Sequence, residues 1–374
     1  MQNSKKEEKR IFFSMSMRFR VPVEHANMIG TIVSSNITKH RFIYVPVPIE
    51  ENGKITRYRL VRAPAISGQA LLNAYERALV DYSLKLEEKL QERFRSKEIK
   101  IIDDYCRQYV FIKHAKSEKD KDSNDKSENK NKKDDKTKSE QDWIRECYVE
   151  DITGYLAPDA NARKTSTIWF SYVVPDFTIS KALLDYQIFA RYALEQTREK
   201  GGFIGERESG HAVYRLSIAI DASRIGYDGK GNLVINNEEE RACRVEAAFK
   251  ALMLMLSGGY IGANRTRALM LEYVKPTSLV AAVSVGLPFM VSPAEGTDYI
   301  VKTCSRATTF VNDLGAEVYL YYLAGDADKP SQCSEKDKLS SESVDSLESA
   351  IDKAMNKVLE KLGLNNKCKA QEYA

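Results

Sequence analysis

The sequence lacks a long hydrophobic run. The longest nearly apolar stretch, residues 279–291, is interrupted by a serine, a glycine and a proline. It falls well short of the ~20 apolar residues that a bilayer-spanning helix needs. Near the N-terminus only Ile11, Phe12 and Phe13 form an apolar stretch, which is too short for a secretory signal. We therefore expect a cytoplasmic protein that has no membrane partner.

Metal-binding spacings are also missing. The six cysteines include no Cys-x-x-Cys pair, and the four histidines are too widely spaced for a zinc-binding helix. Asp103, Asp104 and Asp221 have no second acidic cluster at a predictable distance. We expect no metal and no cofactor, and we expect reduced cysteines that act as small hydrophobic residues.

Positive charge is abundant locally although the whole chain is nearly neutral. The 374 residues carry a formal net charge of only +4, from 57 basic and 53 acidic residues. Residues 18–77 nevertheless contain nine basic side chains, including Arg18, against four acidic ones. Such a cluster attracts polyanions. The alternative is a charged face that only contacts solvent.

Composition divides the chain into a folded body and polar segments. Residues 1–13 are expected to be a disordered tail, and residues 14–325 the body. Residues 115–142, with nine lysines and nine acids, are expected to form a disordered insertion. Residues 326–374 are expected to be a polar linker and a helix, because apolar side chains recur every three or four residues from Val344 to Leu362 and Gly363 follows.

Periodicity within the body predicts alternating strands and helices. Helical spacing begins after Ser67, which is placed to cap the helix, and recurs over residues 241–256 before Gly258 and Gly259. Strands are expected at residues 19–23, 42–48, 167–174, 213–220 and 279–285. Without the insertions the order is strand, helix, strand, strand, helix, strand. This is the α+β order of the ferredoxin-like fold that RNA-recognition modules use.

The segment 36–77 contains the clearest candidate site. Lys39, His40 and Arg41 precede an expected strand, and Ser67, Gly68 and Gln69 begin an expected helix. A helix N-terminus offers free N–H groups and the positive end of a dipole, which suit a phosphate. The alternative is an ordinary serine cap with a glycine in the first turn.

Two further motifs combine basic residues with glycines or aromatics. The glycine-rich segment 258–267 matches no nucleotide-binding fingerprint, but its loop could grip phosphates or simply end a helix. Arg163 and Lys164 precede the aromatic residues Trp169 and Phe170, as in sheets that stack RNA bases, although either ring could belong to the core. The polar side chains that we assign to the glycine-rich loop are Asn264, Arg265 and Arg267.

In combination these motifs resemble the Cas-seven family, also called the DevR autoregulator family. The resemblance covers roughly residues 17–325 and is strongest to the archaeal type I-A branch. It rests on RFRVPVEHANMIG at 18–30, NITKHR at 36–41, APAISGQALLNAYERAL at 63–79, RKTSTIWFSYVVPD at 163–176, YRLSIAIDASRIG at 214–226 and GGYIGANRTR at 258–267.

The resemblance implies a modified RNA-recognition (ferredoxin-like) palm with large insertions that form a finger region and a thumb hairpin. Copies of such a subunit stack in a helical filament along CRISPR RNA, do not cut it, and present it to target DNA beside the other Cascade subunits. It further implies RNA contacts for three groups of residues. These are the phosphate contacts Lys39, His40 and Arg41, the helix-start residues Ser67, Gly68 and Gln69 on the RNA backbone, and the glycine-loop residues Asn264, Arg265 and Arg267. Bacterial relatives carry a basic residue where this sequence has Leu72 and Asn73, and Arg77 is the candidate substitute.

Two other functions stay open from the sequence. Repeat-processing endoribonucleases of the same superfamily cleave RNA without metal, and His25 or His40 would then be the general acid or base. Lone histidines are, however, more often structural or phosphate contacts, so we expect no catalytic residue. A DNA-binding regulator is the second alternative, but the chain shows no helix-turn-helix with a basic recognition helix.

Overall fold

The computed structural model describes residues 9–24, 28–32, 37–52, 54–95, 99–111, 139–158, 161–191, 203–261, 276–331, 333 and 338–368. They form two compact units, each interleaved along the chain. Unit 1 comprises residues 1–75, 169–219 and 253–354, and unit 2 comprises residues 76–168, 220–252 and 355–374. None of the helices in the described ranges is both long and apolar enough to cross a bilayer.

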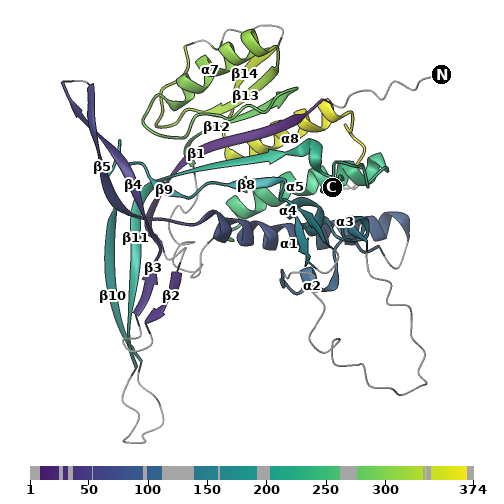
Figure 1. Cartoon of the computed structure of the whole chain (residues 1–374), viewed down its shortest axis with the longest axis horizontal. Helices are drawn as coiled ribbons and strands as arrows, with labels where there is room; N and C mark the ends of the chain where they lie inside the picture. The colour runs from purple at the N-terminus through teal and green to yellow at the C-terminus, as the bar shows by residue number, and fades with distance from the viewer. Residues whose placement is uncertain are drawn as a thin grey trace, which may run out of the picture. The chain divides into compact units, whose positions relative to one another are not determined.

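The mixed α+β composition that the sequence predicts is confirmed (Figure 1). The strands are β1 Ile11–Glu24, β2 Met28–Ile32, β3 Ile37–His40, β4 Phe42–Glu51, β5 Lys54–Pro64, β6 Tyr155–Ala157, β7 Ala162–Lys164, β8 Ile168–Phe170, β9 Val174–Pro175, β10 Leu183–Arg191, β11 Phe203–Asp221, β12 Pro276–Val285, β13 Glu317–Leu323 and β14 Leu339–Ser343. The helices are α1 Gly68–Phe94, α2 Asp104–Arg107, α3 Glu140–Glu146, α4 Tyr148–Thr153, α5 Glu238–Ser257, α7 Tyr299–Leu314 and α8 Leu347–Leu362, with a short 3-10 turn at Ala222–Arg224.

The main sheet of unit 1 is built around β1. Its strand order is β14-β13-β12-β1-β11-β3-β2, and β8, β9 and β10 also pair with β11. β1 runs antiparallel to β12, from the pair Ile11–Val285 to the pair Met17–Leu279. Residues 11–19 of β1 are buried on both faces, and Ser14 Oγ donates a hydrogen bond to the Phe289 carbonyl at 2.9 Å.

Three boundaries differ from the sequence predictions. β1 begins at Ile11, so the expected tail is too long at its C-terminal end; Phe13 is fully buried in the sheet. The expected central strand 167–174 is instead the short strands β8 and β9 beside β11. The expected linker contains β14, which lies parallel to β13 from the pair Val318–Leu339 onward. Pairing between strands that are distant in the sequence sets these boundaries, and such pairing cannot be detected from the local periodicity of the sequence.

The α7 helix covers part of this sheet with an apolar face. Tyr299, Ile300 and Cys304 on α7 pack with Phe289 and Leu320 in one hydrophobic core of unit 1. The predicted C-terminal helix is confirmed as α8, which Ser346 caps by accepting a hydrogen bond from the Ser349 N–H at 3.1 Å and which ends at Gly363 (φ 70°). Its apolar stripe is buried within the chain, at Leu347, Ile351, Met355 and Val358.

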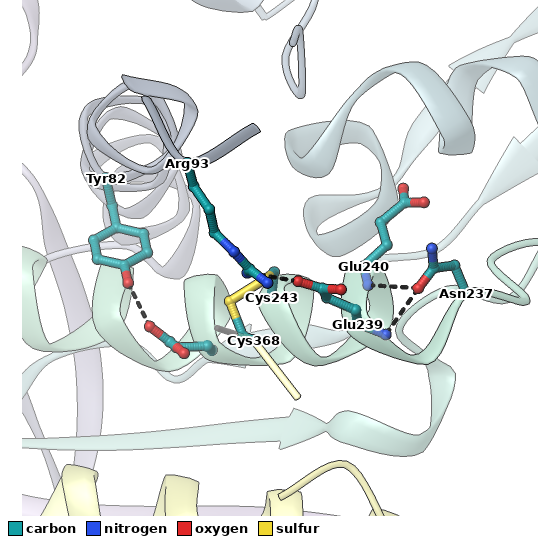
Figure 2. Close-up of a disulfide and its surroundings, with 8 residues drawn as sticks. Tyr82, Arg93, Asn237, Glu239, Glu240, Cys243 and Cys368 are labelled. Atoms are coloured by element: carbon teal, nitrogen blue, oxygen red, sulfur yellow. Dashed lines mark hydrogen bonds and ion pairs between the residues drawn. A yellow bond between two sulfur atoms is a disulfide. The ribbon is translucent and has the colours of Figure 1, made fainter. Parts of the chain in front are cut away.

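Unit 2 contains the β6–β7 hairpin, α2 to α4, and the larger parts of α1 and α5. Asn237 caps the N-terminus of α5, because its side-chain oxygen accepts hydrogen bonds from the N–H groups of Glu239 and Glu240 at 2.9 and 3.2 Å. Polar pairs connect α1 to α5 in unit 2. Tyr82 donates to Glu246 at 2.8 Å, and Arg93 pairs with Glu239 at 2.8 Å (Figure 2).

The cysteines correct one expectation. Cys243 on α5 forms a disulfide with Cys368, with Cα atoms 4.8 Å apart and a sequence separation of 125 (Figure 2), and Cys304 forms one with Cys333. Only two cysteines, 106 and 147, are free and buried as predicted. The spacing of cysteines this far apart in the sequence does not predict which of them form a disulfide, so the disulfide connectivity follows only from the fold.

Most of the insertion 115–142 lies outside the described residues. Its last residues, 139–142, are described and contain the start of α3. Ser139 accepts a hydrogen bond from the helix backbone and Asp142 accepts one from the Ser139 N–H at 2.8 Å, which together form a capping box. The predicted insertion therefore extends too far at its C-terminal end.

Candidate nucleic-acid interface

Backbone hydrogen bonds in unit 1 bring the start of α1 next to Arg41. The Arg41 carbonyl accepts a hydrogen bond from the Ala65 N–H at 3.0 Å. Ile66 and Val173 exchange two backbone hydrogen bonds, at 3.1 and 2.9 Å. Segments that are more than a hundred residues apart in sequence therefore meet where α1 begins.

The Arg41 side chain is held at this surface by an aromatic ring. Its guanidinium donates to the Tyr172 hydroxyl at 2.9 Å and lies 5.6 Å from the centre of that ring. Tyr172 is 40% exposed. A guanidinium stacked on an aromatic ring stays charged and presents a planar set of donors, which suits a phosphate.

The start of α1 has the predicted cap. Ser67 Oγ accepts a hydrogen bond from the Ala70 N–H at 3.2 Å. The N–H groups of Gly68 and Gln69 have no acceptor within the helix, because they belong to its first turn. The Gln69 side chain is exposed beside them. Arg41, Ser67, Gly68 and Gln69 thus form one candidate anion-binding surface, which we call the helix-start surface.

Gly68 has a structural role at the start of α1. A Cβ atom on Gly68 would lie 2.5 Å from the Phe170 carbonyl oxygen. The close approach that glycine permits is therefore to the chain's own β8 strand, where Phe170 also packs against Tyr75 with ring centres 5.8 Å apart. Gly68 therefore positions the start of α1 against β8.

Lys164 is a correction. It is buried on β7 and its ammonium contacts the carboxylate of buried Asp151, with Arg244 on the other carboxylate oxygen at 3.0 Å. Burial lowers the pKa of Lys164, although Asp151 opposes this. A side chain enclosed in an internal ion pair cannot reach RNA, so we exclude Lys164 from the interface; its neighbour Arg163 is exposed.

Arg18 is a second basic residue that the structure places inside. It is fully buried and pairs with Asp176 at 3.2 Å and with Asp326 at 3.0 Å, and it donates to the Gly296 carbonyl at 2.6 Å. The positive segment 18–77 therefore presents one charge fewer than the sequence suggests. These bonds connect β1 to three segments of unit 1, after β9, before α7 and after β13.

The remaining predicted residues are distributed more widely. Lys39 and His40 lie on β3, where they pair with Gly30 and Met28 of β2. Arg77 is exposed on the part of α1 that belongs to unit 2. The glycine-loop residues Asn264, Arg265 and Arg267 lie outside the described residues.

Two aromatic residues bear on this site: Tyr172, which the sequence did not predict as a site component, and Trp169, which the sequence offered for base stacking. Tyr172 stood in the quoted motif 163–176 but no sequence signal pairs it with Arg41. Trp169 is 40% exposed and the centre of its ring lies 6.2 Å from that of Phe12, so it remains a candidate for base stacking at the sheet surface.

One group of side chains in unit 2 could hold a metal ion. Asp103, Cys106 and Cys147 each offer one ligand atom, and these three atoms lie within 4.8 Å of one another. The Asp103 carboxylate already accepts hydrogen bonds from the N–H groups of Tyr105 and Cys106, at 2.8 and 2.9 Å. The carboxylate thus has a structural task, as the cap of α2.

The molecule is thus an α+β protein with an arginine and a capped helix start gathered on one surface. The family described as the CRISPR-associated negative auto-regulator DevR/Csa2 matches residues 15–304, and the chain belongs to this family. The resemblance drawn from the sequence is confirmed.

Individual relatives agree with this assignment. The chain is 31% identical over 301 residues to the CRISPR-associated aCascade subunit Cas7/Csa2 2 of Saccharolobus solfataricus, covering 78% of this chain and 85% of the relative. A second protein of that organism, Cas7/Csa2 1, is 27% identical over 330 residues, covering 84% and 92%. A chain of a solved CRISPR RNA-guided surveillance complex in a pre-nicking state has the same fold, with a TM-score of 0.53 at 11% identity, and covers 93% of this chain and 100% of that one.

Proposed function

We propose that this protein is a non-catalytic, RNA-binding backbone subunit of a type I-A Cascade complex. Several copies would bind along one CRISPR RNA, beside other Cascade subunits, and hold the guide for pairing with target DNA in antiviral defence. The observation that carries the proposal is the helix-start surface, which occurs in a chain whose relative is named an aCascade subunit.

The order of the elements supports an RNA-recognition-like palm. Leaving insertions aside, the chain runs β1, α1, β8, β11, α5, β12. In the sheet β12 neighbours β1, β1 neighbours β11, and β8 pairs with β11 (Figure 1). Numbered as four strands, this is the order 4-1-3-2, which the ferredoxin-like fold of RNA-recognition modules adopts.

Contacts to phosphates do not depend on sequence, which suits a subunit that must hold any guide. Arg41 supplies a positive charge and several N–H donors, and the helix start supplies further N–H donors. Because every neutralised phosphate releases counterions, we expect affinity to fall steeply with salt concentration.

Two substitutions test this surface. Arg41→Ala should weaken RNA binding about 10- to 100-fold by removing a charge-assisted contact, and it should reduce the slope of log K against log salt by about 1. Gln69→Ala should weaken binding only about 2- to 10-fold and leave the slope unchanged, because it removes no charge. Binding is measured by fluorescence anisotropy with labelled single-stranded RNA over a salt series.

Lys302→Ala is the matched control, because Lys302 is a 60%-exposed base on α7 away from the helix-start surface. It should leave both affinity and slope near those of the unaltered protein. If all three variants bound RNA with the same affinity, the assignment of RNA binding to the helix-start surface would be refuted. Electron microscopy of the protein purified with its own nucleic acid tests the assembly: helical particles with uniform RNA are expected, whereas monomers that shorten repeat RNA would establish the endoribonuclease.

A further inference from the structure

The β4–β5 hairpin presents an exposed apolar face that the helix-start surface does not include. In the antiparallel register Tyr44 lies opposite Arg62, Pro46 opposite Leu60, and Pro48 opposite Tyr58. Directly opposed residues share a face of a two-stranded sheet. The even-numbered residues of the segments 42–48 and 58–64 therefore form one face, which we call the tyrosine face.

The exposure of this face is unusual for its composition. Tyr44 is 69% exposed, Leu60 is 66% exposed and Tyr58 is 65% exposed. On the opposite face Val45, by contrast, is buried. Isolated apolar residues on a surface are ordinary, but a contiguous group of this kind marks a surface that binds something.

The hairpin also carries a net positive charge. Residues 42–64 contain four basic and two acidic side chains. Arg57, Arg59 and Arg62 are exposed on β5. The guanidinium of Arg62 lies 3.7 Å from the centre of the Phe42 ring, which fixes a cation at the end of the tyrosine face.

The prolines limit how a partner can approach. Pro46 and Pro48 lack N–H groups, so β4 is a poor template for an added strand of another protein. The tyrosine face itself, where two tyrosine rings and a fixed arginine stand, offers another mode of binding. Proteins bind single-stranded nucleic acid with aromatic rings that have cations beside them, because the bases stack on the rings and the phosphates contact the cations.

We propose that the tyrosine face binds single-stranded RNA by stacking bases on Tyr44 and Tyr58, with Arg62 on the phosphate backbone. This inference rests on the proposed function, because the strand it holds is the same guide RNA that contacts the helix-start surface. The two rings are four positions apart along the hairpin register, about 13 Å at the rise of an extended strand. They therefore hold two separate bases instead of an adjacent pair.

The test measures binding of a labelled single-stranded RNA by anisotropy with the full chain. Tyr44→Ala and Tyr58→Ala should each weaken binding at least about fivefold, and their salt slope should remain unchanged because stacking releases no counterions. Tyr44→Phe and Tyr58→Phe should retain nearly full affinity, since phenylalanine keeps the stacking ring. Tyr105→Ala is the matched control, because Tyr105 is a 57%-exposed tyrosine on α2.

The results separate this inference from the proposed function. If the unaltered protein bound no RNA, the proposed function itself would fail. If Arg41→Ala weakened binding while both alanine variants of the tyrosine face bound RNA normally, only the inference would be overturned. Loss of self-association in sedimentation at unchanged RNA affinity would likewise overturn it, since the tyrosine face would then bind another copy of the chain.

Discussion

Replacing Asp151 with asparagine would remove one negative charge from the interior of unit 2 without changing the size of the side chain. Asp151 contacts Lys164 and Arg244, and all three side chains are completely buried. It also accepts hydrogen bonds from the Gly226 N–H, at 3.1 and 3.0 Å to its two oxygens. Burial alone would raise the pKa of Asp151, but the two cations outweigh it and hold that pKa below its ordinary value.

The magnitude follows from what the substitution leaves behind. Arg244 keeps Glu240 at 2.6 Å and the Ile144 carbonyl at 2.7 Å. Lys164 loses its only charged partner in the network and keeps neutral acceptors, among them the Arg224 carbonyl at 3.4 Å. Removing one partner of a buried pair costs about 3–5 kcal/mol, a large part of the ~5–15 kcal/mol by which a typical domain is stable.

Urea denaturation, followed by circular dichroism, measures this cost. Asp151→Asn should lower the free energy of unfolding by that amount, whereas Asp151→Asn combined with Lys164→Met should recover part of the loss, because the uncompensated ammonium is then gone. Lys164→Met alone should leave RNA affinity unchanged. A cost below about 1 kcal/mol, or strictly additive costs in the double variant, would refute the network.

The sign of the pH dependence can also be worked out. Because the folded pKa of Asp151 is lowered, its contribution is present above the unfolded pKa of about 3.9 and is lost as pH falls through the folded pKa. Near neutral pH the network should therefore contribute fully. Lowering the pH should therefore reduce the free energy of unfolding of the unaltered protein more than that of the Asp151→Asn variant.

Three further predictions concern other residues. Burial, with a smaller contribution from a neighbouring carboxylate, raises the pKa of Glu76 to about 7, so up to about 3 kcal/mol of stability present below pH ~4.5 should be lost as pH rises through ~7. Glu76→Gln should flatten the dependence of Tm on pH over this range, and an unchanged profile would contradict the assignment. Gly68→Ala should cost about 1–3 kcal/mol in a denaturation curve, because the new Cβ meets the Phe170 carbonyl; an unchanged midpoint would argue against that close approach. Cys368→Ser should lower stability by about 4–5 kcal/mol only under non-reducing conditions, because the disulfide with Cys243 closes a loop of 125 residues, and an equal loss in reductant would show that the bond is not the cause.

Local signals in the sequence were sufficient for the elements that carry their own start and stop. Ser67 caps α1, and Gly258 and Gly259 follow the end of α5 as predicted. Gly363 ends α8. Caps and periodicity are properties of a few neighbouring residues, so they can be detected without knowing what the element packs against.

The burial of charge could not be predicted in the same way. Arg18 and Lys164 stand in basic motifs, and their sequence neighbours contain nothing that shows them to be internal. Their burial depends on Asp176, Asp326 and Asp151, which the fold brings to them from other segments. A charged residue is buried only with its partner, so the signal exists only once the long-range contacts are known.

The helix-start surface combines both kinds of information. Ser67 and Gln69 come from a local helix signal, whereas Arg41 is placed beside them by the bonds to Ala65 and Tyr172. The same backbone that approaches Gly68 also leads to Tyr172, so the packing of α1 on β8 and the position of the Arg41 cation are set by one short segment. A substitution that displaces this segment should therefore weaken RNA binding even where it removes no contact to RNA, and Gly68→Ala should reduce both stability and affinity while Gln69→Ala reduces affinity alone.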